Sequence, residues 1–567
     1  MGTLLMCFSS CLCFFLLVIL LKFLNKVWWA PIRVQSLMKS QGIEGPPYRF
    51  LYGSTTEILN IINAMDGSSQ ELSHNTFARI LPHAYSWVKV YGMNFLYWYG
   101  PQPHLMVTEP ELVKEILSNK DGDYKKIPVE THVKRLLGDG LVTSSGEKWF
   151  KMRKLGNQAF HGESLKGMIP DMIASVEVML KRWRNHEGKE IDTFQEFKVL
   201  TSEVISRTAF GSSYLEGQHI FDMIMNMIDI IYRNNYRISI PFIGKIFKSS
   251  DDIESENLEK RVRESIIKMM KKREEEATSG HLDGYGNDFF GLLLKAYHDP
   301  DNSKKISVDD LIDECKTIYV AGQETTTSLL SWTVLLLAIC PDWQDKVRKE
   351  VLELIGQQNP SPDRMTKLKI MSMVINESLR LYAPSNYLAR KVDKEVRLGN
   401  LILPANMEIY MSTLAHHYNP EIWGEDVHLF KPERFAEGVA KATNKSIATF
   451  FPFGMGPRTC LGFNYAIIEG KIALSMILQR YRFTLSPTYV HHPVHLLTVC
   501  PKRGIQTEWL RTFYSYNILK TIHVQSYINK IAIVLSINDP HQLCNEIEES
   551  LKIIKEVAIN YVVNIWS

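Results

Sequence analysis

The 567-residue sequence has little of several features that mark common protein classes. Its eight cysteines form no Cys-x-x-Cys pair and no regular ladder of spacings, which argues against a zinc ribbon and against a disulfide framework. Its 65 Lys and Arg residues nearly balance 62 Asp and Glu residues, so the formal charge of +3 gives no support to a nucleic-acid partner. Beyond residue 50 there is no internal repeat and no low-complexity linker. With 45% hydrophobic residues, the chain is long and apolar enough to bury a large core.

Charge is absent from the N-terminal stretch Gly2 to Leu21, whose side chains are mostly large and apolar. That length can span a bilayer, and no basic segment precedes it as in a cleaved signal peptide. Basic residues follow it instead, at Lys22, Lys26, Arg33 and Lys39, together with Trp28 and Trp29 at the position of an interfacial aromatic belt. By the positive-inside rule, the sequence predicts a transmembrane signal-anchor helix over residues 2–24, with the remainder cytosolic. A buried core helix is the alternative.

Gly45-Pro46-Pro47 is a stiff, non-helical break. We therefore expect a linker over residues 25–47, followed by a globular domain over 48–510. Apolar runs of helical period dominate residues 165–185, 195–210, 218–233, 257–277, 307–340 and 463–481. Short strand-like pieces occur at 105–107, 396–398 and 409–411. The fold class predicted is mainly α (α+β), with one small sheet at the side.

A lone cysteine, Cys460, lies in the glycine-rich segment 453–462, directly before an apolar helical run that starts near Phe463. The free N–H groups and the dipole of a helix N-terminus favour a thiolate. Glycines at 454, 456 and 462 permit unusual dihedrals and close approach to a flat ligand, while Arg458 offers a cation to an acidic group on that ligand. These are the requirements of a haem iron bound by thiolate. An inert buried cysteine in a glycine-rich turn is the alternative.

The segment resembles the haem-binding signature of the cytochrome P450 family at Phe453, Gly456, Arg458, Cys460 and Gly462. This resemblance implies heme b as cofactor, bound through the Cys460 thiolate. It also implies the cytochrome P450 fold, with a long central helix over the haem, a small β-rich region and an N-terminal membrane anchor helix.

Ser307 and Asp310 form a capping-box pattern that opens a helix of about 30 residues ending before Pro341. Its middle, residues 321–326, has a glycine followed by an acid and two threonines, which weakens a helix unless a ligand must fit there. The segment resembles the oxygen-activation motif of the family. The resemblance implies catalytic roles for Thr325, which would hydrogen-bond the oxygen, and Glu324, which would help to relay protons. An ordinary polar patch on a buried helix is the alternative.

Two further pairs match the family in order along the chain. Glu377 and Arg380 face the same side of a helix, which alone predicts only a simple surface pair. The resemblance implies a buried structural network completed by Arg434 from the later segment 432–435. Trp149 and Arg153 lie one helical turn apart and, with Arg458 and Arg390, are implied to bind the two haem propionates.

The resemblance covers approximately residues 30–508 and is nearest to the plant clan numbered seventy-two, judged by residues 41–50 and 451–454. That clan is associated with hydroxylating hydrophobic terpenoid-derived molecules, including plant hormones. The chain differs from the residues usual in that clan at Ala383, at Phe463 and over residues 385–387. Residues 511–567 have no counterpart, so we expect an atypical C-terminal extension without assigned function.

The function implied is a membrane-bound haem-thiolate monooxygenase that inserts one oxygen atom from O2 into a lipophilic small molecule such as a terpenoid, a steroid or a hormone-like compound. The sequence has no Gly-x-Gly-x-x-Gly fingerprint in a strand-turn-helix setting, so electrons must come from outside. The expected partner is NADPH-cytochrome P450 reductase, and the expected location is the endoplasmic reticulum membrane, crossed once, with the catalytic domain cytosolic. A haem-thiolate isomerase or dehydratase acting on hydroperoxides, and a catalytically silent haem-binding protein, are the alternatives. Substrate contacts are expected around residues 125–131, 223–242 and 385–388, and residues 238–247 are expected to be surface.

Overall fold

The structure is a computed structural model, which describes residues 2–66, 72–186, 188–212, 214–234, 248–444 and 446–511. The chain divides into two units, Met1–Leu510 and Arg511–Ser567. The expected extension 511–567 and the segment 238–247 therefore fall almost wholly outside the described residues.

Helices dominate the first unit, as predicted. The longer helices are α1 (Gly2–Leu24), α2 (Ala30–Ser40), α3 (Thr55–Asp66), α5 (Pro82–Tyr91), α6 (Pro110–Ser118), α7 (Thr131–Leu137), α8 (Gly146–Phe160), α10 (Ile169–Trp183), α11 (Thr193–Phe210), α12 (Tyr214–Asn234), α14 (Ser250–Thr278), α15 (Phe289–Tyr297), α16 (Val308–Ile339), α17 (Pro341–Leu354), α19 (Lys369–Leu381) and α23 (Phe463–Arg480). Shorter ones are α4 (Thr76–Ile80), α9 (Gly162–Gly167), α18 (Pro362–Thr366), α20 (Thr413–His417), α21 (Pro420–Trp423) and α22 (Val439–Ala442). Each helical run predicted from the sequence corresponds to one or two of these helices.

Within the described residues, the strands form four small sheets instead of the one predicted. The strands are β1 (Phe95–Tyr99), β2 (Gln102–Met106), β3 (Tyr124–Lys125), β4 (Glu190–Asp192), β5 (Tyr387–Val392), β6 (Val396–Leu398), β7 (Leu401–Leu403), β8 (Glu408–Ser412), β9 (Tyr481–Leu485), β10 (Pro493–His495), β11 (Val499–Pro501) and β12 (Gln506–Arg511). The main sheet has the order β1-β2-β8-β5-β3, with β2 parallel to β8 and the other pairs antiparallel. The remaining sheets are β4-β12-β9, β10-β11 and β6-β7. The strand predicted at 396–398 thus pairs apart from the other two, because it forms its own hairpin with β7.

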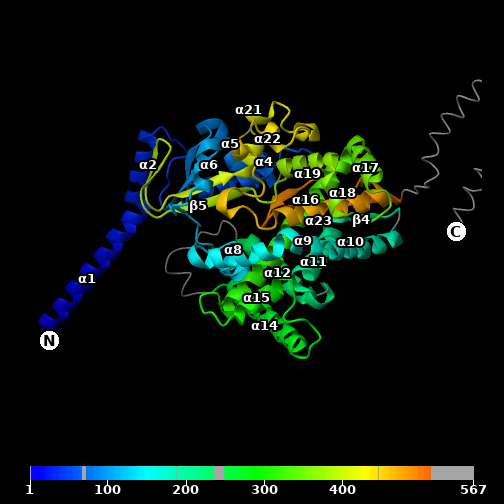
Figure 1. Cartoon of the computed structure of the whole chain (residues 1–567). Helices are drawn as coiled ribbons and strands as arrows, with labels where there is room; N and C mark the ends of the chain where they lie inside the picture. Colours follow the sequence, from blue (N-terminus) through cyan, green and yellow to red (C-terminus); the bar gives the residue numbers. More distant parts are fainter. Residues whose placement is uncertain are drawn as a thin grey trace, which may run out of the picture. The chain divides into compact units, whose positions relative to one another are not determined.

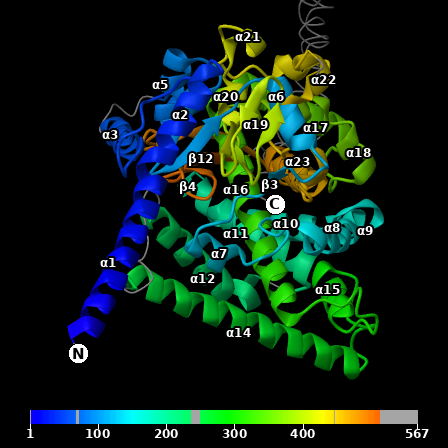
Figure 2. The ribbon, with the colours of Figure 1, turned by 90° about the vertical axis from the view of Figure 1, so that its left-hand side faces the viewer.

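Helix α16 lies in the core of the helical region (Figure 1). The capping box predicted at its start is present, since the Asp310 N–H donates to the Ser307 hydroxyl and the Asp310 carboxylate accepts from the Ser307 N–H. Helices α11, α19 and α23 pack against it. Figure 2 shows α14 along one edge of this region, where it packs on α12. Most side chains of α16 are buried, so it can carry chemical groups into the interior.

The N-terminal segment differs from the expected linker over residues 25–40. A π-helical turn, Asn25–Trp29, joins α1 directly to α2. Pro31 at the start of α2 has no N–H for the carbonyl of Val27, and the hydroxyl of Tyr48 donates to that carbonyl instead. Gln41 exchanges two hydrogen bonds with the backbone of Ile402 in β7, so the end of α2 is fixed to the globular part. The break at Gly45-Pro46-Pro47 is non-helical, as expected.

One helix among the described residues, Met6–Ser40, is long and apolar enough to cross a membrane. Its mean hydropathy reaches 2.5 and none of the apolar window is buried against the protein. This is compatible with a membrane anchor and argues against the alternative of a buried core helix.

Candidate functional site

The loop before α23 holds Cys460 in a defined turn. The Cys460 N–H donates to the carbonyl of Phe453 at 2.8 Å, which closes the loop. Gly454 and Gly456 have φ values of 71° and 73°, and a Cβ at Gly456 would lie 2.1 Å from the carbonyl oxygen of Leu117 in α6. Gly456 is therefore required both by its dihedral and by the close approach of α6.

Gly462 differs from the other two glycines. Its φ of −86° is ordinary, so the expectation of an unusual dihedral is wrong at this position. A Cβ built on Gly462 would meet no atom within 4 Å. The absent side chain leaves open space beside Cys460, which is what close approach to a flat ligand requires.

The Cys460 thiol is accessible to solvent, yet the surrounding protein raises its pKa by desolvation. The Gly462 N–H and the Arg153 guanidinium lower the pKa, as the helix-terminus argument predicts, but desolvation outweighs both. Protein groups alone therefore do not make Cys460 a thiolate, and a bound cation such as a metal would have to supply the remaining stabilisation.

Three cations gather on one side of this loop. Arg390 in β5 is buried, and burial together with Arg458 lowers the pKa of its guanidinium to about 10. Burial, Arg390 and Arg458 lower the pKa of Lys126 to about 7. The register of β3 with β5, continued by one residue, sets Lys126 opposite Arg390. Sequence reasoning missed Lys126, because only this pairing of distant strands brings it to the cluster.

None of these three side chains is paired with a carboxylate of the described residues. Arg390 donates to the carbonyl of Ala389 at 2.8 Å, and Arg458 donates to that of Ser144 at 2.9 Å. Mutually repelling cations in a desolvated place are stabilised by a dianionic ligand. The cluster therefore suits the two carboxylates of a haem.

Trp149 and Arg153, both on α8, contact this loop at different points. The Arg458 guanidinium lies 4.5 Å from the Trp149 ring centroid, in cation–π geometry. The Arg153 guanidinium donates to the Thr459 carbonyl at 2.6 Å, next to Cys460. Arg153 thus lies beside the cysteine, and whether either residue also binds a propionate stays a prediction.

Phe453 and Phe463 frame the loop at its two ends. Their rings meet edge to face, with centroids 4.7 Å apart and an interplanar angle of 82°. Phe463 stays 44% exposed. The departure from the family habit at this position therefore adds an aromatic contact that supports Phe453.

The central part of α16 stays helical through residues 321–326, so the expected weakening is not visible. A Cβ at Gly322 would lie 2.7 Å from Cδ1 of Ile205, so the glycine lets α11 pack closely against α16. Thr325 is accessible although most of the helix is buried, and its hydroxyl donates to the Ala321 carbonyl at 2.7 Å. Thr325 therefore offers a hydroxyl to accessible space.

Glu324 is buried beside Thr325. Desolvation raises the pKa of its carboxyl, and Lys198 in α11 opposes the rise. One carboxyl oxygen accepts from the Thr498 hydroxyl at 3.5 Å, while the other has no hydrogen-bond partner among the described residues. Such a group holds a proton at a higher pH than an exposed glutamate does.

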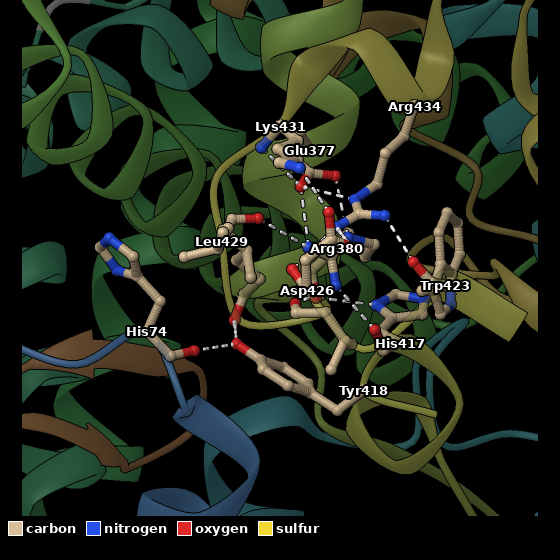
Figure 3. Close-up of polar contacts among 12 residues, drawn as sticks. His74, Glu377, Arg380, His417, Tyr418, Trp423, Asp426, Leu429, Lys431 and Arg434 are labelled. Carbon is tan, nitrogen blue, oxygen red and sulfur yellow. Dashed lines mark hydrogen bonds and ion pairs between the residues drawn. The ribbon is translucent and has the colours of Figure 1, made fainter. Parts of the chain in front are cut away.

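The predicted network of Glu377, Arg380 and Arg434 is present (Figure 3). Arg380 donates twice to Glu377, at 2.7 and 2.8 Å, and the Arg434 Nε lies 3.5 Å from the same carboxylate. Arg380 also donates to the carbonyls of His417 and Val427, both at 2.9 Å. The alternative of a simple surface pair is wrong, because Glu377 and Arg380 have no exposed surface.

The chain's other departures from the family habit lie in the same region. Ala383 is fully buried. Asn386 is buried, and its carbonyl accepts the Thr413 N–H at 3.0 Å, while Tyr387 is 38% exposed. The segment 385–387 therefore presents one large polar side chain, Tyr387, to accessible space.

The residues present fit a haem. Open space adjoins Gly462, Cys460 is accessible beside it, and cations without carboxylate partners among the described residues lie nearby. Across the described ranges there is no group of three or more His, Cys, Asp or Glu side chains able to hold a metal ion, so Cys460 is the protein ligand that this site offers.

The comparisons with known proteins agree with this reading. The family model "Cytochrome P450" matches residues 79–509, so the match ends before the expected extension. A protein named cytochrome P450 CYP749A22, from Panax ginseng, is 56% identical over 499 residues, covering 88% of this chain and 95% of the relative. Cytochrome P450 72A68 from Medicago truncatula is 37% identical over 491 residues, with 85% and 93% coverage. An 11-oxo-beta-amyrin 30-oxidase from Glycyrrhiza uralensis is 39% identical over 493 residues, with 85% and 93% coverage. The predicted resemblance is confirmed.

Proposed function

The chain belongs to the cytochrome P450 family, and from that premise we propose that Cys460 is the haem ligand of a membrane-anchored monooxygenase. The enzyme oxidises a neutral or weakly polar terpenoid-like molecule, receives electrons from NADPH-cytochrome P450 reductase, and resides in the endoplasmic reticulum membrane with its catalytic domain in the cytosol. The proposal is carried by one combination of features. Cys460 is accessible, and the nearby cations Lys126, Arg390 and Arg458 lack carboxylate partners in the described part of the chain. The oxidase among the relatives supports a terpenoid substrate.

Haem, when bound, supplies the redox chemistry that inserts one atom of O2 into a C–H bond. Arg390, Arg458 and Lys126 would hold its two carboxylates, and Gly462 would leave room for its edge. Arg153 and the Gly462 N–H would stabilise negative charge on the Cys460 sulfur.

Glu324 and Thr325 would manage protons. The Glu324 carboxyl can hold a proton because burial raises its pKa, and Lys198 acts on it electrostatically from α11. Thr325 would donate a hydrogen bond to a ligand after releasing the Ala321 carbonyl. Buried residues around this part of α16 exclude bulk water. Protons would therefore pass through Glu324 and Thr325.

Spectroscopy and product analysis test the proposal. The reduced carbon monoxide difference spectrum of the wild-type protein should be that of a haem-thiolate, and Cys460→Ala should lose it. With reductase and NADPH, the wild type should add one oxygen atom to a triterpene such as 11-oxo-β-amyrin, detected by mass spectrometry. Product formation from a hydroperoxide without reductase would instead support the isomerase or dehydratase, and no oxygen consumption with any ligand would support a silent haem-binding protein.

A matched pair of threonines tests the proton path. Thr325→Ala should lower the product formed per NADPH about tenfold and divert oxygen to hydrogen peroxide. Thr333→Ala is the control, since its hydroxyl makes the same bond to the carbonyl four residues earlier, at 2.7 Å, but lies two turns further along α16. Equal coupling in the two variants would contradict the role of Thr325.

A further inference from the structure

A tryptophan of α16 stacks on a buried tyrosine. The ring centroids of Trp332 and Tyr382, the residue that follows α19, are 4.2 Å apart, and the two rings are inclined by only 12°. Both side chains are fully enclosed by the protein. The Trp332 Nε1–H donates to the carbonyl of Val499 at 2.9 Å, which fixes the indole in this position. The two kinds of aromatic side chain that lose an electron most easily are therefore in direct contact inside the protein.

The Tyr382 hydroxyl lies between two histidines. It is 2.8 Å from Nδ1 of His74 and 3.4 Å from Nε2 of His491. Nε2 of His491 is also 3.1 Å from the carbonyl of Ser73, which can only accept, so Nε2 carries the proton of this imidazole. Its Nδ1 then accepts from the Tyr489 hydroxyl at 2.8 Å. Tyr382 accepts from His491, so it donates its own proton to Nδ1 of His74.

Both imidazoles are neutral at pH 7. Burial and the charge of Arg380 lower the pKa of His74 to about 4, and burial lowers that of His491 to about 3. Burial raises the pKa values of Tyr382 and Tyr489, so both hydroxyls keep their protons. Each hydroxyl thus faces an imidazole nitrogen with a free lone pair. A phenol that loses an electron becomes a strong acid, and these nitrogens are placed to take up its proton.

These side chains lead from the helix that carries Thr325 to the surface. Trp332 lies two turns after Thr325, about 10 Å along the axis of α16. At the other end, His74 and Tyr489 are half-buried, so solvent reaches them. The stacked pair, which is fully enclosed, therefore connects the neighbourhood of the proposed haem site with side chains that a soluble molecule can approach.

We propose that Trp332 and Tyr382 supply electrons to the haem site when a peroxide reacts there without a substrate, and that His74 takes up the phenolic proton. This inference rests on the proposed function. One electron passes from Trp332 to the haem site, and one electron from Tyr382 refills the indole. The Tyr382 O–H bond breaks and its proton moves to Nδ1 of His74, which leaves a neutral tyrosyl radical and a protonated imidazole. Two such electrons and two protons from solvent reduce one hydrogen peroxide to two water molecules.

Tyr489 carries the radical to the surface. It gives one electron to Tyr382, its proton moves to Nδ1 of His491, and the proton on His74 returns to Tyr382. A soluble one-electron reductant such as ascorbate then gives an electron to Tyr489, and His491 returns the proton. The pathway therefore removes the oxidant and leaves every side chain as it was.

Freeze-quench electron paramagnetic resonance of the haem-loaded full-length protein tests the proposal. Hydrogen peroxide is added without reductase or substrate. The wild type should give a tyrosyl radical, whose signal narrows when the protein contains ring-deuterated tyrosine and disappears when ascorbate is added. Tyr382→Phe and Trp332→Phe, which keep an aromatic ring in the stack, should each lose this signal and bleach their haem faster. His74→Asn keeps a hydrogen-bond acceptor but removes the base, so it should slow radical formation on the order of a hundredfold.

The control is Tyr319→Phe, on the other side of Thr325 along α16. Tyr319 is also fully buried and stacked, with its ring centroid 3.9 Å from that of Phe210, but its hydroxyl donates to the sulfur of Met269 at 3.7 Å instead of to an imidazole. This variant should leave the radical signal and the haem lifetime unchanged. A wild-type protein with the haem-thiolate carbon monoxide spectrum but no tyrosyl radical, an unchanged signal in Tyr382→Phe, or an equal loss in Tyr319→Phe would overturn the inference. A wild-type protein without that spectrum would instead contradict the proposed function, so the two failures are distinguishable.

Discussion

Arg380 and Glu377 meet through two parallel hydrogen bonds, from Nε to Oε2 at 2.8 Å and from Nη2 to Oε1 at 2.7 Å, with no exposed surface on either side chain. The same arginine donates to the carbonyls of His417 and Val427, which belong to the segment after β8. The Lys431 N–H donates to Glu377 at 3.0 Å, so the carboxylate also fixes the segment that leads to Arg434 (Figure 3). One ion pair on α19 thereby orders the chain leading to the cysteine loop.

Breaking this pair should be severely destabilising. Arg380→Ala leaves the Glu377 carboxylate buried and several carbonyls without donors, so we expect a loss of about 3–5 kcal/mol in the free energy of unfolding and loss of bound haem. Arg482→Ala is the control, because Arg482 pairs with Asp345 at 2.8 Å with both side chains 54% exposed, and it should cost less than about 1 kcal/mol. Urea unfolding followed by circular dichroism measures both. Similar losses in the two variants would refute the special role of the buried pair.

Two glycines of the cysteine loop should respond differently to the same substitution. Gly456→Ala forces a Cβ onto a residue with φ of 73° and to within 2.1 Å of a backbone oxygen, so it should lower stability by at least about 2 kcal/mol. Gly462→Ala has an ordinary φ and meets no atom within 4 Å, so it should leave the unfolding midpoint unchanged while the haem content per protein falls. Thermal unfolding and the pyridine haemochrome assay give the two quantities. Normal haem content in Gly462→Ala would show that haem does not occupy the open space beside Gly462.

Haem retention should depend on pH through Lys126. Its pKa of about 7 in the protein without haem lies well below the ordinary lysine value of 10.5, so its amine is partly neutral near pH 7. A carboxylate ligand favours the charged form, so haem binding takes up a proton and should weaken as the pH rises from about 7 towards 10. Lys126→Gln should speed haem loss about tenfold at pH 7 and flatten this pH dependence.

The adjacent lysine supplies the control for that experiment. Lys125 is exposed and pairs with Asp393 at 2.7 Å, so Lys125→Gln should leave haem loss unchanged. Transfer of haem to apomyoglobin, recorded between pH 6 and 10, gives the rates. A wild-type rate that stays constant over this range would rule out the coupling to Lys126.

Local patterns predicted contacts between residues close in sequence, whereas the long-range contact of Arg434 with Glu377 was predicted only through the family resemblance. Glu377 with Arg380 and Ser307 with Asp310 are three positions apart, and a helix or a helix start fixes such pairs locally. Lys126 could not be found in this way, because its neighbours come from a distant strand. The mainly helical fold followed from the 3.6-residue period, whereas the division into four sheets depends on pairing between segments that no local pattern encodes.

The pKa of the Cys460 thiol also depends on tertiary packing. The reactivity of this thiol in the absence of haem can be predicted from that dependence. Local reasoning predicts an activated thiolate at the start of α23, but desolvation raises the pKa above its ordinary value of 9.0. In haem-free protein that keeps its helical circular dichroism, iodoacetamide should therefore alkylate Cys460 more slowly at pH 8 than it does in urea-unfolded protein, as measured by peptide mass spectrometry. Arg153→Ala should slow the reaction further, since that guanidinium lowers the pKa, whereas Lys154→Ala, one residue away and exposed, should not. Alkylation that is faster in the folded protein than in urea would mean that the helix terminus outweighs desolvation after all, and the haem iron would then bind a sulfur that the protein had already ionised.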